Sequence, residues 1–347
     1  MTASHPTVLD YPFAAPPPPG EAAEVAPGVW WIRMPLPFAL DHINLWLLAG
    51  DDGWTLVDTG YGNGATRALW EIHFAATLRD RPLGRVIATH FHPDHLGNAA
   101  WLSRRFDCPV TMTHSEFLTA HAVLAQQPTH AIGDTCALFA AHGMATDQVA
   151  ELVGRGNHYR RGVPELPERF TRMLHDDALS VGGAEWRVLC GFGHSPEHAS
   201  LHDGRRAVLI SGDMLLPRIS TNIAVWPAMP EGDPLGRFLA SIAAFDELPP
   251  DTLVLPSHGL PFRGIALRVG QLQAHHAARL AELDDALRAA REPVSAAQML
   301  PVLFRRELDL QQHFFAMGEA IAHLNHLWHR GRIRRTVATD GAIRFAA

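Results

Sequence analysis

Short apolar runs, most of them ended by Gly, Pro, Asp or Ser, recur along this chain and predict β-strands. Between some of them lie stretches with helical periodicity, including residues 65–78. Because strands alternate with helical stretches, the pattern predicts a mixed α/β fold. The predicted strands cover residues 29–34, 43–48, 54–57, 85–89, 109–113, 186–190, 207–210 and 253–255.

Residues 115–175 interrupt this alternation with irregular helical patterns that are broken by Gly and Pro. The region is too apolar to be a disordered linker, so we interpret it as a helical insertion lying over the sheet edge. Insertions of this length in compact domains are usually functional. We therefore expect residues 115–175 to form one wall of a substrate pocket.

The two ends of the chain have different patterns from the centre. Residues 1–26 contain four consecutive prolines and predict an extended arm. From residue 265 onward, an amphipathic helix, a capping box at Ser295–Gln298, a helix over about 311–329 and a final hairpin follow one another. We interpret residues 27–264 as the main domain and residues 265–347 as a small winged-helix-like domain.

Composition and charge exclude several classes of protein. A hydrophobic content of 47%, a charged content of 19% and no apolar run near 18 residues argue against a membrane-spanning chain. Three unpaired cysteines and the lack of a signal-peptide pattern predict a cytoplasmic location. The net charge of -7 is far from a nucleic-acid-binding signature, although residues 265–347 carry more Arg than acidic side chains.

The densest chemistry lies in residues 89–95, which read Thr-His-Phe-His-Pro-Asp-His. In a chain with 22 His, one histidine carries little information. Three imidazoles and a carboxylate on one strand-to-helix turn have no packing reason to be together, but they suit Zn²⁺ and similar metals. Further strands run into His194, Asp213 and His258. Because α/β folds place their sites at strand ends, these residues can converge on the same turn.

Together, these motifs resemble the metallo-β-lactamase superfamily over about residues 27–264, with Asp58 in the first motif. The resemblance implies an αββα sandwich that binds two divalent metal ions, Zn²⁺ in the first place and Fe or Mn as alternatives. It also implies that His90, His92 and His194 hold one ion, that Asp94, His95 and His258 hold the other, and that Asp213 bridges them.

Two further residues belong to the predicted site without being ligands. The resemblance implies that Asp58 orients the metal ligands from behind, the alternative being an ordinary turn residue at a strand end. His198 either supports a ligand in the same way or holds the turn that follows His194. An Asp at position 213 resembles the branch related to hydroxyacylglutathione hydrolase.

The resemblance implies a hydrolase in which a metal-bridged hydroxide attacks an acyl carbon and Asp94 orients the nucleophile and accepts its proton. We expect a small-molecule thioester or ester, of the acyl-CoA or acyl-glutathione type. An endoribonuclease that uses Arg330, Arg332, Arg334 and Arg335 to contact phosphates is one alternative, and a non-catalytic metal-binding protein is another. The oligomeric state is open, with a homodimer as one candidate.

Four more residues are predicted to contact the substrate. Tyr159 and Arg160 offer a ring and a cation in a segment rich in helix breakers, suited to gripping a polar or anionic substrate. Arg218 and Asn222 follow Asp213 closely and could face them across the metals.

Overall fold

Seven strands form the first sheet in the order in which they occur along the chain. In the computed structural model, which describes residues 8–51, 53–79 and 81–347, β1 to β4 pair antiparallel and β4 to β7 pair parallel. The strands are β1 (Ala22–Ala26), β2 (Val29–Pro35), β3 (His42–Ala49), β4 (Trp54–Val57), β5 (Leu83–Ile87), β6 (Val110–Met112) and β7 (Thr171–Arg172).

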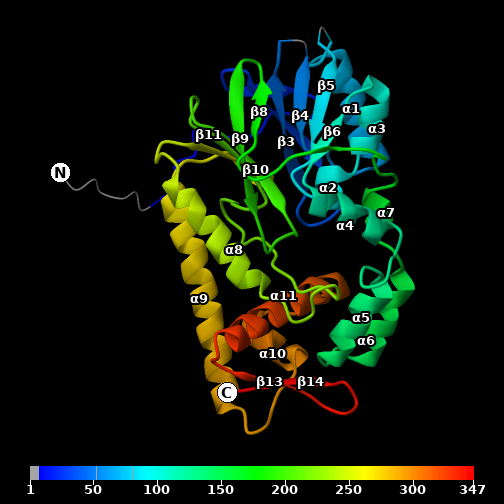
Figure 1. The fold of residues 1–347 in the computed structure, drawn as a ribbon, viewed down its shortest axis with the longest axis vertical. Helices are drawn as coiled ribbons and strands as arrows, with labels where there is room; N and C mark the ends of the chain where they lie inside the picture. The colour runs from blue at the N-terminus through cyan, green and yellow to red at the C-terminus, as the bar shows by residue number, and fades with distance from the viewer. Residues whose placement is uncertain (1–7, 52, 80) are drawn as a thin grey trace, which may run out of the picture.

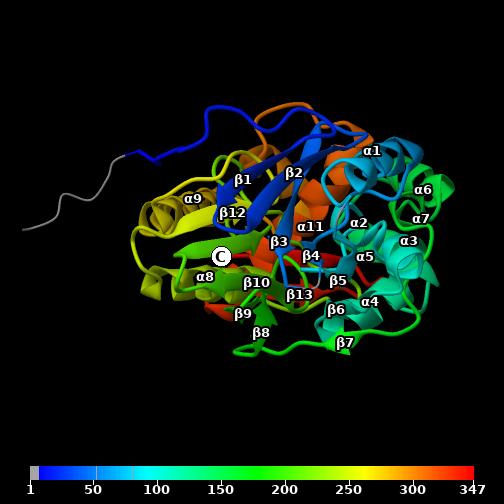
Figure 2. The ribbon, with the colours of Figure 1, turned by 90° about the horizontal axis from the view of Figure 1, so that it is seen from above.

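Five later strands form the second sheet, which lies beside the first when seen from above (Figure 2). Their order is β12-β11-β10-β9-β8, and only β11 and β12 run parallel. The strands are β8 (Ala178–Val181), β9 (Ala184–Gly191), β10 (His198–Asp203), β11 (Val208–Gly212) and β12 (Leu253–Pro256). The sequence pattern missed β8 and β10, and all six residues of β10 are buried although four are polar.

Alternation along the strands explains the layering. In β11, Val208 and Ile210 join the apolar cluster between the sheets, whereas Leu209 joins a second cluster with the helices outside. The first sheet is covered by α1 (Gly64–Ala75), α2 (Pro93–Leu96) and α3 (Ala99–Phe106). The second is covered by α8 (Pro234–Ala243), the short η1 (Ala244–Glu247) and α9 (Ile265–Ala289) (Figure 1). The predicted αββα sandwich is confirmed.

The helical insertion is confirmed as helical, but it divides into two parts. It contains α4 (His114–Leu124), α5 (Ile132–Ala141), α6 (Thr146–Arg155) and α7 (Tyr159–Gly162). Helices α4 and α7 lie near the first sheet, whereas α5 and α6 lie in the lower part of the molecule beside the C-terminal helices (Figure 1). There Phe139 packs edge-on against Phe314 at 5.5 Å, and the His142 carbonyl accepts a hydrogen bond from Ala297 N–H. The insertion therefore has two parts, and its role as a wall of the substrate pocket stays a prediction.

The C-terminal region contains α9, α10 (Ala296–Leu303), α11 (Leu310–His329), β13 (Arg334–Val337) and β14 (Ile343–Ala346). The predicted capping box of Ser295 and Gln298 is present, and a second one joins Asp309 and Gln312. The two strands form the predicted hairpin, and the winged-helix assignment stays a prediction. At the other end, residues 22–26 of the predicted arm pair with β2 as β1, and residues 1–7 of the arm lie outside the described residues.

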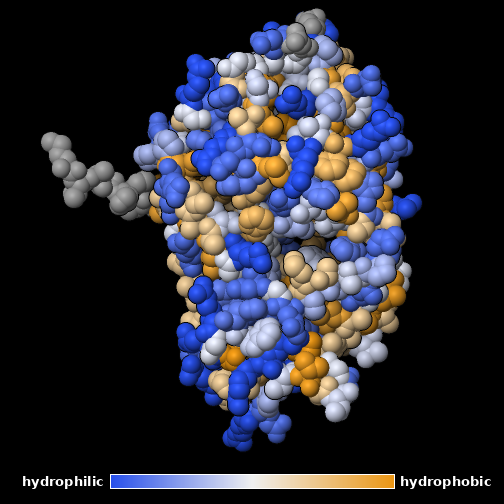
Figure 3. All heavy atoms as spheres, in the orientation of Figure 1, coloured by the Kyte–Doolittle hydropathy of each residue, from blue (hydrophilic) through white to orange (hydrophobic). Residues whose placement is uncertain are grey.

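Within the part of the chain that the structure describes, no helix has both the length and the apolar character needed to cross a membrane. On the face drawn in Figure 3, apolar side chains occur in several small groups among polar ones.

Candidate metal centre

The predicted ligands and Asp58 come from five separate strand ends and meet where the two sheets approach each other. Asp58 directly follows β4, and the loop from β5 into α2 carries residues 90–95. His194 lies between β9 and β10, Asp213 directly follows β11, and His258 follows β12. The structure brings all seven predicted ligands into two neighbouring groups.

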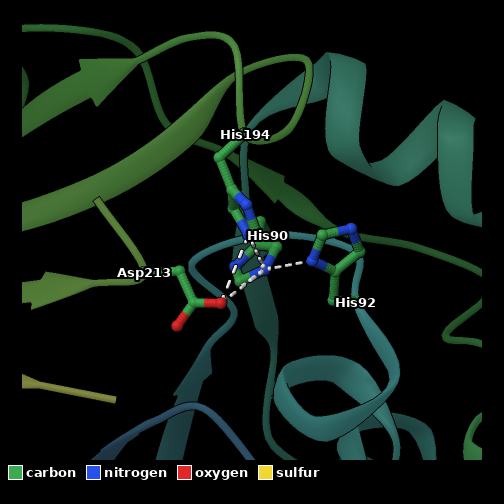
Figure 4. Close-up of side chains that lie close together, drawn as sticks. All are labelled: His90, His92, His194 and Asp213. Carbon is green, nitrogen blue, oxygen red and sulfur yellow. Dashed lines mark hydrogen bonds and ion pairs between the residues drawn. The ribbon is translucent and has the colours of Figure 1, made fainter. Parts of the chain in front are cut away.

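The first group consists of His90, His92, His194 and Asp213 (Figure 4). His90 Nε2 lies 2.8 Å from His92 Nδ1 and 3.2 Å from His194 Nε2. Asp213 Oδ2 lies 3.2 Å from His194 Nε2 and 3.9 Å from His90 Nε2. Four ligand atoms thus surround one point.

The second group consists of Asp94, His95 and His258. Asp94 Oδ2 lies 3.6 Å from His95 Nε2 and 3.5 Å from His258 Nε2. The other carboxylate oxygen of Asp213, Oδ1, lies 3.6 Å from His95 Nε2 and 3.3 Å from His258 Nε2. Asp213 therefore touches both groups, one oxygen to each, which is the bridging position that the resemblance implies.

Hydrogen bonds behind the ligands fix which nitrogen of each ring faces the site. Since a carbonyl can only accept, His194 Nδ1 donates to Asn222 O and His258 Nδ1 donates to His42 O, each at 2.8 Å. His95 Nδ1 donates to Asp58 Oδ2 at 2.8 Å. When these three rings are neutral, Nε2 carries no proton and its lone pair points into the site.

Asp58 has a positive φ of 61°, which a non-glycine residue rarely adopts. In this conformation it accepts from Thr89 N–H at 2.8 Å and from the Thr89 hydroxyl, besides holding His95. Because the Thr89 hydroxyl donates to Asp58, it can accept from His90 Nδ1, 3.1 Å away. One carboxylate thus orients two histidines, the role that the resemblance implies for it.

His198 lies behind Asp213. Its Nε2 accepts the Asp213 backbone N–H at 3.1 Å, and its ring centre lies 4.8 Å from that of His90. Gly212 makes this contact possible, because a Cβ there would lie 2.3 Å from His198 Nε2 and its φ is +53°. Of the two predicted roles, this contact corresponds to support of a ligand, Asp213, and the role stays a prediction.

The charges at the site attract a cation. Burial is the main reason that the pKa of His90 and of His92 lies well below 6.5, so both rings are neutral. Burial also acts against a charged His95, but Asp58, Asp94 and Asp213 together raise its pKa well above 6.5. The same carboxylates that would hold a proton there would attract a divalent ion in its place.

The residues present fit a divalent metal. Buried inside the site, His95 Nε2, His258 Nε2 and Asp213 Oδ1 have no hydrogen-bond partner among the described residues. Unpaired buried atoms of this kind are costly unless an ion or water satisfies them. Imidazole nitrogen and carboxylate oxygen are the ligands of Zn²⁺ and related metals.

Glu116, at the start of α4, is a site residue that the sequence analysis missed. It is fully buried, and its carboxylate accepts from Phe91 N–H at 2.9 Å, from the Ser195 hydroxyl at 2.6 Å and from Glu197 N–H at 2.6 Å. Phe91 and Ser195 are neighbours of metal-site histidines on opposite sheets. Glu116 therefore ties the two ligand loops together, and no local sequence pattern indicates this.

The predicted substrate residues lie in different surroundings. Tyr159 is buried, and its hydroxyl donates to the Phe91 carbonyl at 2.6 Å, so it supports the ligand loop. Arg160 is exposed on the same short helix, and Arg218 lies over the ring of Tyr11, 5.9 Å from its centre. The backbone carbonyl of Asn222 holds His194, while its side-chain Oδ1 is buried with no hydrogen-bond partner in the part of the chain that the structure describes. Their contact with a substrate stays a prediction.

Two of the four C-terminal arginines are already paired with carboxylates. Arg332 pairs with Asp284, and Arg335 pairs with Glu231 at 2.8 Å. Two of the four arginines proposed for phosphate contact are therefore already neutralised, which weakens the nucleic-acid alternative.

Comparison with known proteins places this geometry among metal-dependent hydrolases. Residues 39–258 match a family model described as "Metallo-beta-lactamase superfamily", and residues 282–347 match one described as "Metallo-beta-lactamase-like, C-terminal domain". The chain is 46% identical to a solved "Beta-lactamase domain protein from Burkholderia ambifaria", with a TM-score of 0.90 and coverage of 97% of this chain and 98% of that one.

Two curated relatives are more distant. The "Probable metallo-hydrolase YqjP" of Bacillus subtilis (strain 168) is 25% identical over 85% of this chain and 91% of its own length. The "Acyl-coenzyme A thioesterase MBLAC2" of Gallus gallus is 27% identical over 54% of this chain and 63% of its own length.

Proposed function

Because the chain belongs to the metallo-beta-lactamase superfamily, we propose that it is a hydrolase that holds two divalent metal ions and cleaves an acyl thioester or related ester. The observation that carries this proposal is the arrangement of the two ligand groups around Asp213, with Nε2 lone pairs of His95, His194 and His258 aimed into the site. We propose Zn²⁺ as the native ion, with Fe or Mn as alternatives.

Metal binding and proton transfer would fall to different residues of the site. His90, His92 and His194 would hold one ion, Asp94, His95 and His258 the other, and Asp213 both. Bound there, the ions would supply an activated water and an electrophilic partner for the substrate oxygen. The Asp94 side chain is 13% accessible, whereas that of the adjacent His95 is fully buried. This carboxylate can therefore reach the reacting water, orient it and accept its proton.

The distant similarity to an acyl-coenzyme A thioesterase supports a thioester as the substrate class. The paired arginines of the C-terminal region give no comparable support for a phosphodiester. Elemental analysis of metal-reloaded protein, combined with activity on thioesters, oxyesters and RNA, tests both points. We expect two equivalents of metal and preferential thioester cleavage. Two equivalents of metal with cleavage of RNA alone would overturn the substrate assignment.

The role of Asp94 is tested separately. Asp94→Asn keeps the size of the side chain but removes its charge, so we expect kcat to fall by about 100-fold or more. Asp147→Asn, an exposed carboxylate on α6, is the matched control and should leave kcat unchanged. An Asp94→Asn protein with full metal and full activity would refute this role.

A further inference from the structure

Three segments of the chain converge beside Asp94 at the edge of the metal centre. Gly162, the last residue of α7, lies against Tyr61 and Pro93, because a Cβ there would be 2.2 Å from Tyr61 Cε2 and 2.6 Å from Pro93 Cβ. Its carbonyl accepts from Gly62 N–H at 2.8 Å. The end of α7 is therefore clamped between the turn after β4 and the start of α2, immediately before Asp94.

Tyr61 is held rigidly in this junction. Its ring lies between Gly162 and Phe38, which packs edge-on with ring centres 5.9 Å apart, and its carbonyl accepts from the Asn98 side chain at 3.1 Å. Its hydroxyl, in contrast, makes no hydrogen bond to any residue that the structure describes. Burial raises the pKa of Tyr61, Arg161 opposes that effect and Asp94 adds to it, so the fields of both charges reach the hydroxyl.

Arg161 supplies an available positive charge at the same place. It is exposed, and it makes no ion pair with the described residues. Nearby Arg67 and Arg104 both pair with Glu165, at 3.4 and 2.5 Å, and are not available in this way. Arg161 directly precedes Gly162, which packs against the Tyr61 ring and against Pro93, the residue before Asp94. The guanidinium and the phenolic hydroxyl thus belong to the same junction, and neither has a hydrogen-bond or ion-pair partner among the described residues.

We propose that Tyr61 and Arg161 form a subsite that binds an anionic oxygen group, a carboxylate or phosphate, on the acyl or the thiol part of the substrate. The guanidinium fork matches the geometry of carboxylate and phosphate, and the hydroxyl adds a fixed donor. Phe38, 48% exposed beside Tyr61, covers the apolar part of the same substrate. This inference rests on the proposed hydrolase function. It assigns binding of the anionic group of the substrate to residues other than Tyr159 and Arg160.

Kinetics with four thioesters locate the anionic group. Succinyl and butyryl groups, each carried on coenzyme A and on N-acetylcysteamine, vary the charge of the acyl and thiol parts independently. We expect Arg161→Gln to raise KM about tenfold or more for substrates with the recognised charge and less than about twofold for the others, at unchanged kcat and metal content. Tyr61→Phe should raise the same KM values by a smaller factor.

Two other arginines make the test specific. Arg172→Gln removes an exposed arginine on β7 and should change no KM value. Arg160→Gln tests the neighbouring residue on α7. An Arg161→Gln protein whose KM rises equally for charged and uncharged substrates, or no more than that of Arg160→Gln, overturns the proposal.

A binding measurement separates this inference from the proposed reaction. If the metal-loaded wild type hydrolyses none of the four thioesters, the proposed function fails, and calorimetry with succinate, butyrate and adenosine 3′,5′-bisphosphate still tests the subsite. At least tenfold weaker binding of one of the two multiply charged probes by Arg161→Gln supports it. Equal binding by wild type and variant, or no binding by wild type, overturns it.

Discussion

Replacing Glu116 with Gln tests whether one buried carboxylate holds the two ligand loops together. The substitution preserves the volume of the side chain and one of its two acceptor oxygens. That oxygen can still accept from Ser195 and Glu197, but the new amide NH2 group then faces the Phe91 N–H, which loses its acceptor. Two donors thus point at each other in a fully buried position.

The size of the effect follows from these contacts. A buried donor left without an acceptor costs about 1–3 kcal/mol, and the two surviving hydrogen bonds lose the strength that comes from a charged acceptor. Gln also removes the cost of burying a charge, the effect that raises the pKa of Glu116. The net loss should be roughly 1–3 kcal/mol, a large share of a typical unfolding free energy of about 5–15 kcal/mol. Glu116→Ala removes all three acceptor contacts and should cost more.

Thermal unfolding and metal affinity are the two measurements. We expect the melting temperature of the metal-free Glu116→Gln protein to fall by about 1–4 °C. Because residues behind metal ligands typically change affinity by about 10–100-fold, a dye-competition assay should show weaker metal binding as well.

A matched control separates burial from charge. Glu71 also accepts two hydrogen bonds, from Arg105 at 2.9 Å, but its side chain is 52% exposed. Glu71→Gln should therefore cost less than about 1 kcal/mol and leave metal affinity unchanged. If Glu116→Gln behaves like Glu71→Gln in both assays, the loops do not depend on the carboxylate and the reasoning is wrong.

Three further predictions concern single residues. His258→Ala should reduce the metal content from two equivalents toward one, because its group keeps too few protein ligands, and elemental analysis that still finds two equivalents would contradict the assignment. Tyr159→Phe loses the hydrogen bond to Phe91 and should destabilise the protein by about 1–2 kcal/mol without changing KM. A changed KM at full stability would instead indicate that Tyr159 contacts the substrate. Burial raises the pKa of Glu319 from 4.5 to about 7, so the folded protein holds this proton to higher pH than the unfolded chain and loses stability as pH rises through that window. In metal-free protein, Glu319→Gln should therefore gain about 3 kcal/mol over wild type between pH 4 and pH 8, and a pH-independent difference would refute the assignment.

The sequence could predict the metal centre because its ligands lie at the ends of strands that have strong local signals. Residues 85–89 and 253–255 are apolar runs, and the polar residues that follow them have only one edge of the sheet to occupy. The fold class follows from the same alternation. Strand β10 was missed because His198, Ser200, His202 and Asp203 give it a polar pattern, although tertiary contacts bury every residue.

The surroundings of the ligands could not be predicted in the same way. Glu116 is one acidic residue at the start of a helix, a position where such residues are usually solvated. Only the approach of two distant loops makes it an anchor. Tyr159 offered a polar donor suited to a substrate, but the donor is used internally by the Phe91 carbonyl. The roles of Glu116 and Tyr159 both depend on contacts between residues far apart in the sequence, and no local pattern predicts such contacts.

The insertion helices α5 and α6 bury their apolar face against helices that lie far later in the chain. During translation, Phe139 and Leu152 are therefore synthesised long before α10 and α11 exist to cover them. At about 5–20 residues per second, the interval until α11 is complete is on the order of 10–30 seconds. The nascent chain must pass this period with an uncovered apolar surface next to a finished metal-site loop. Its yield in a cell should then depend on chaperone capacity more strongly than its final stability would suggest.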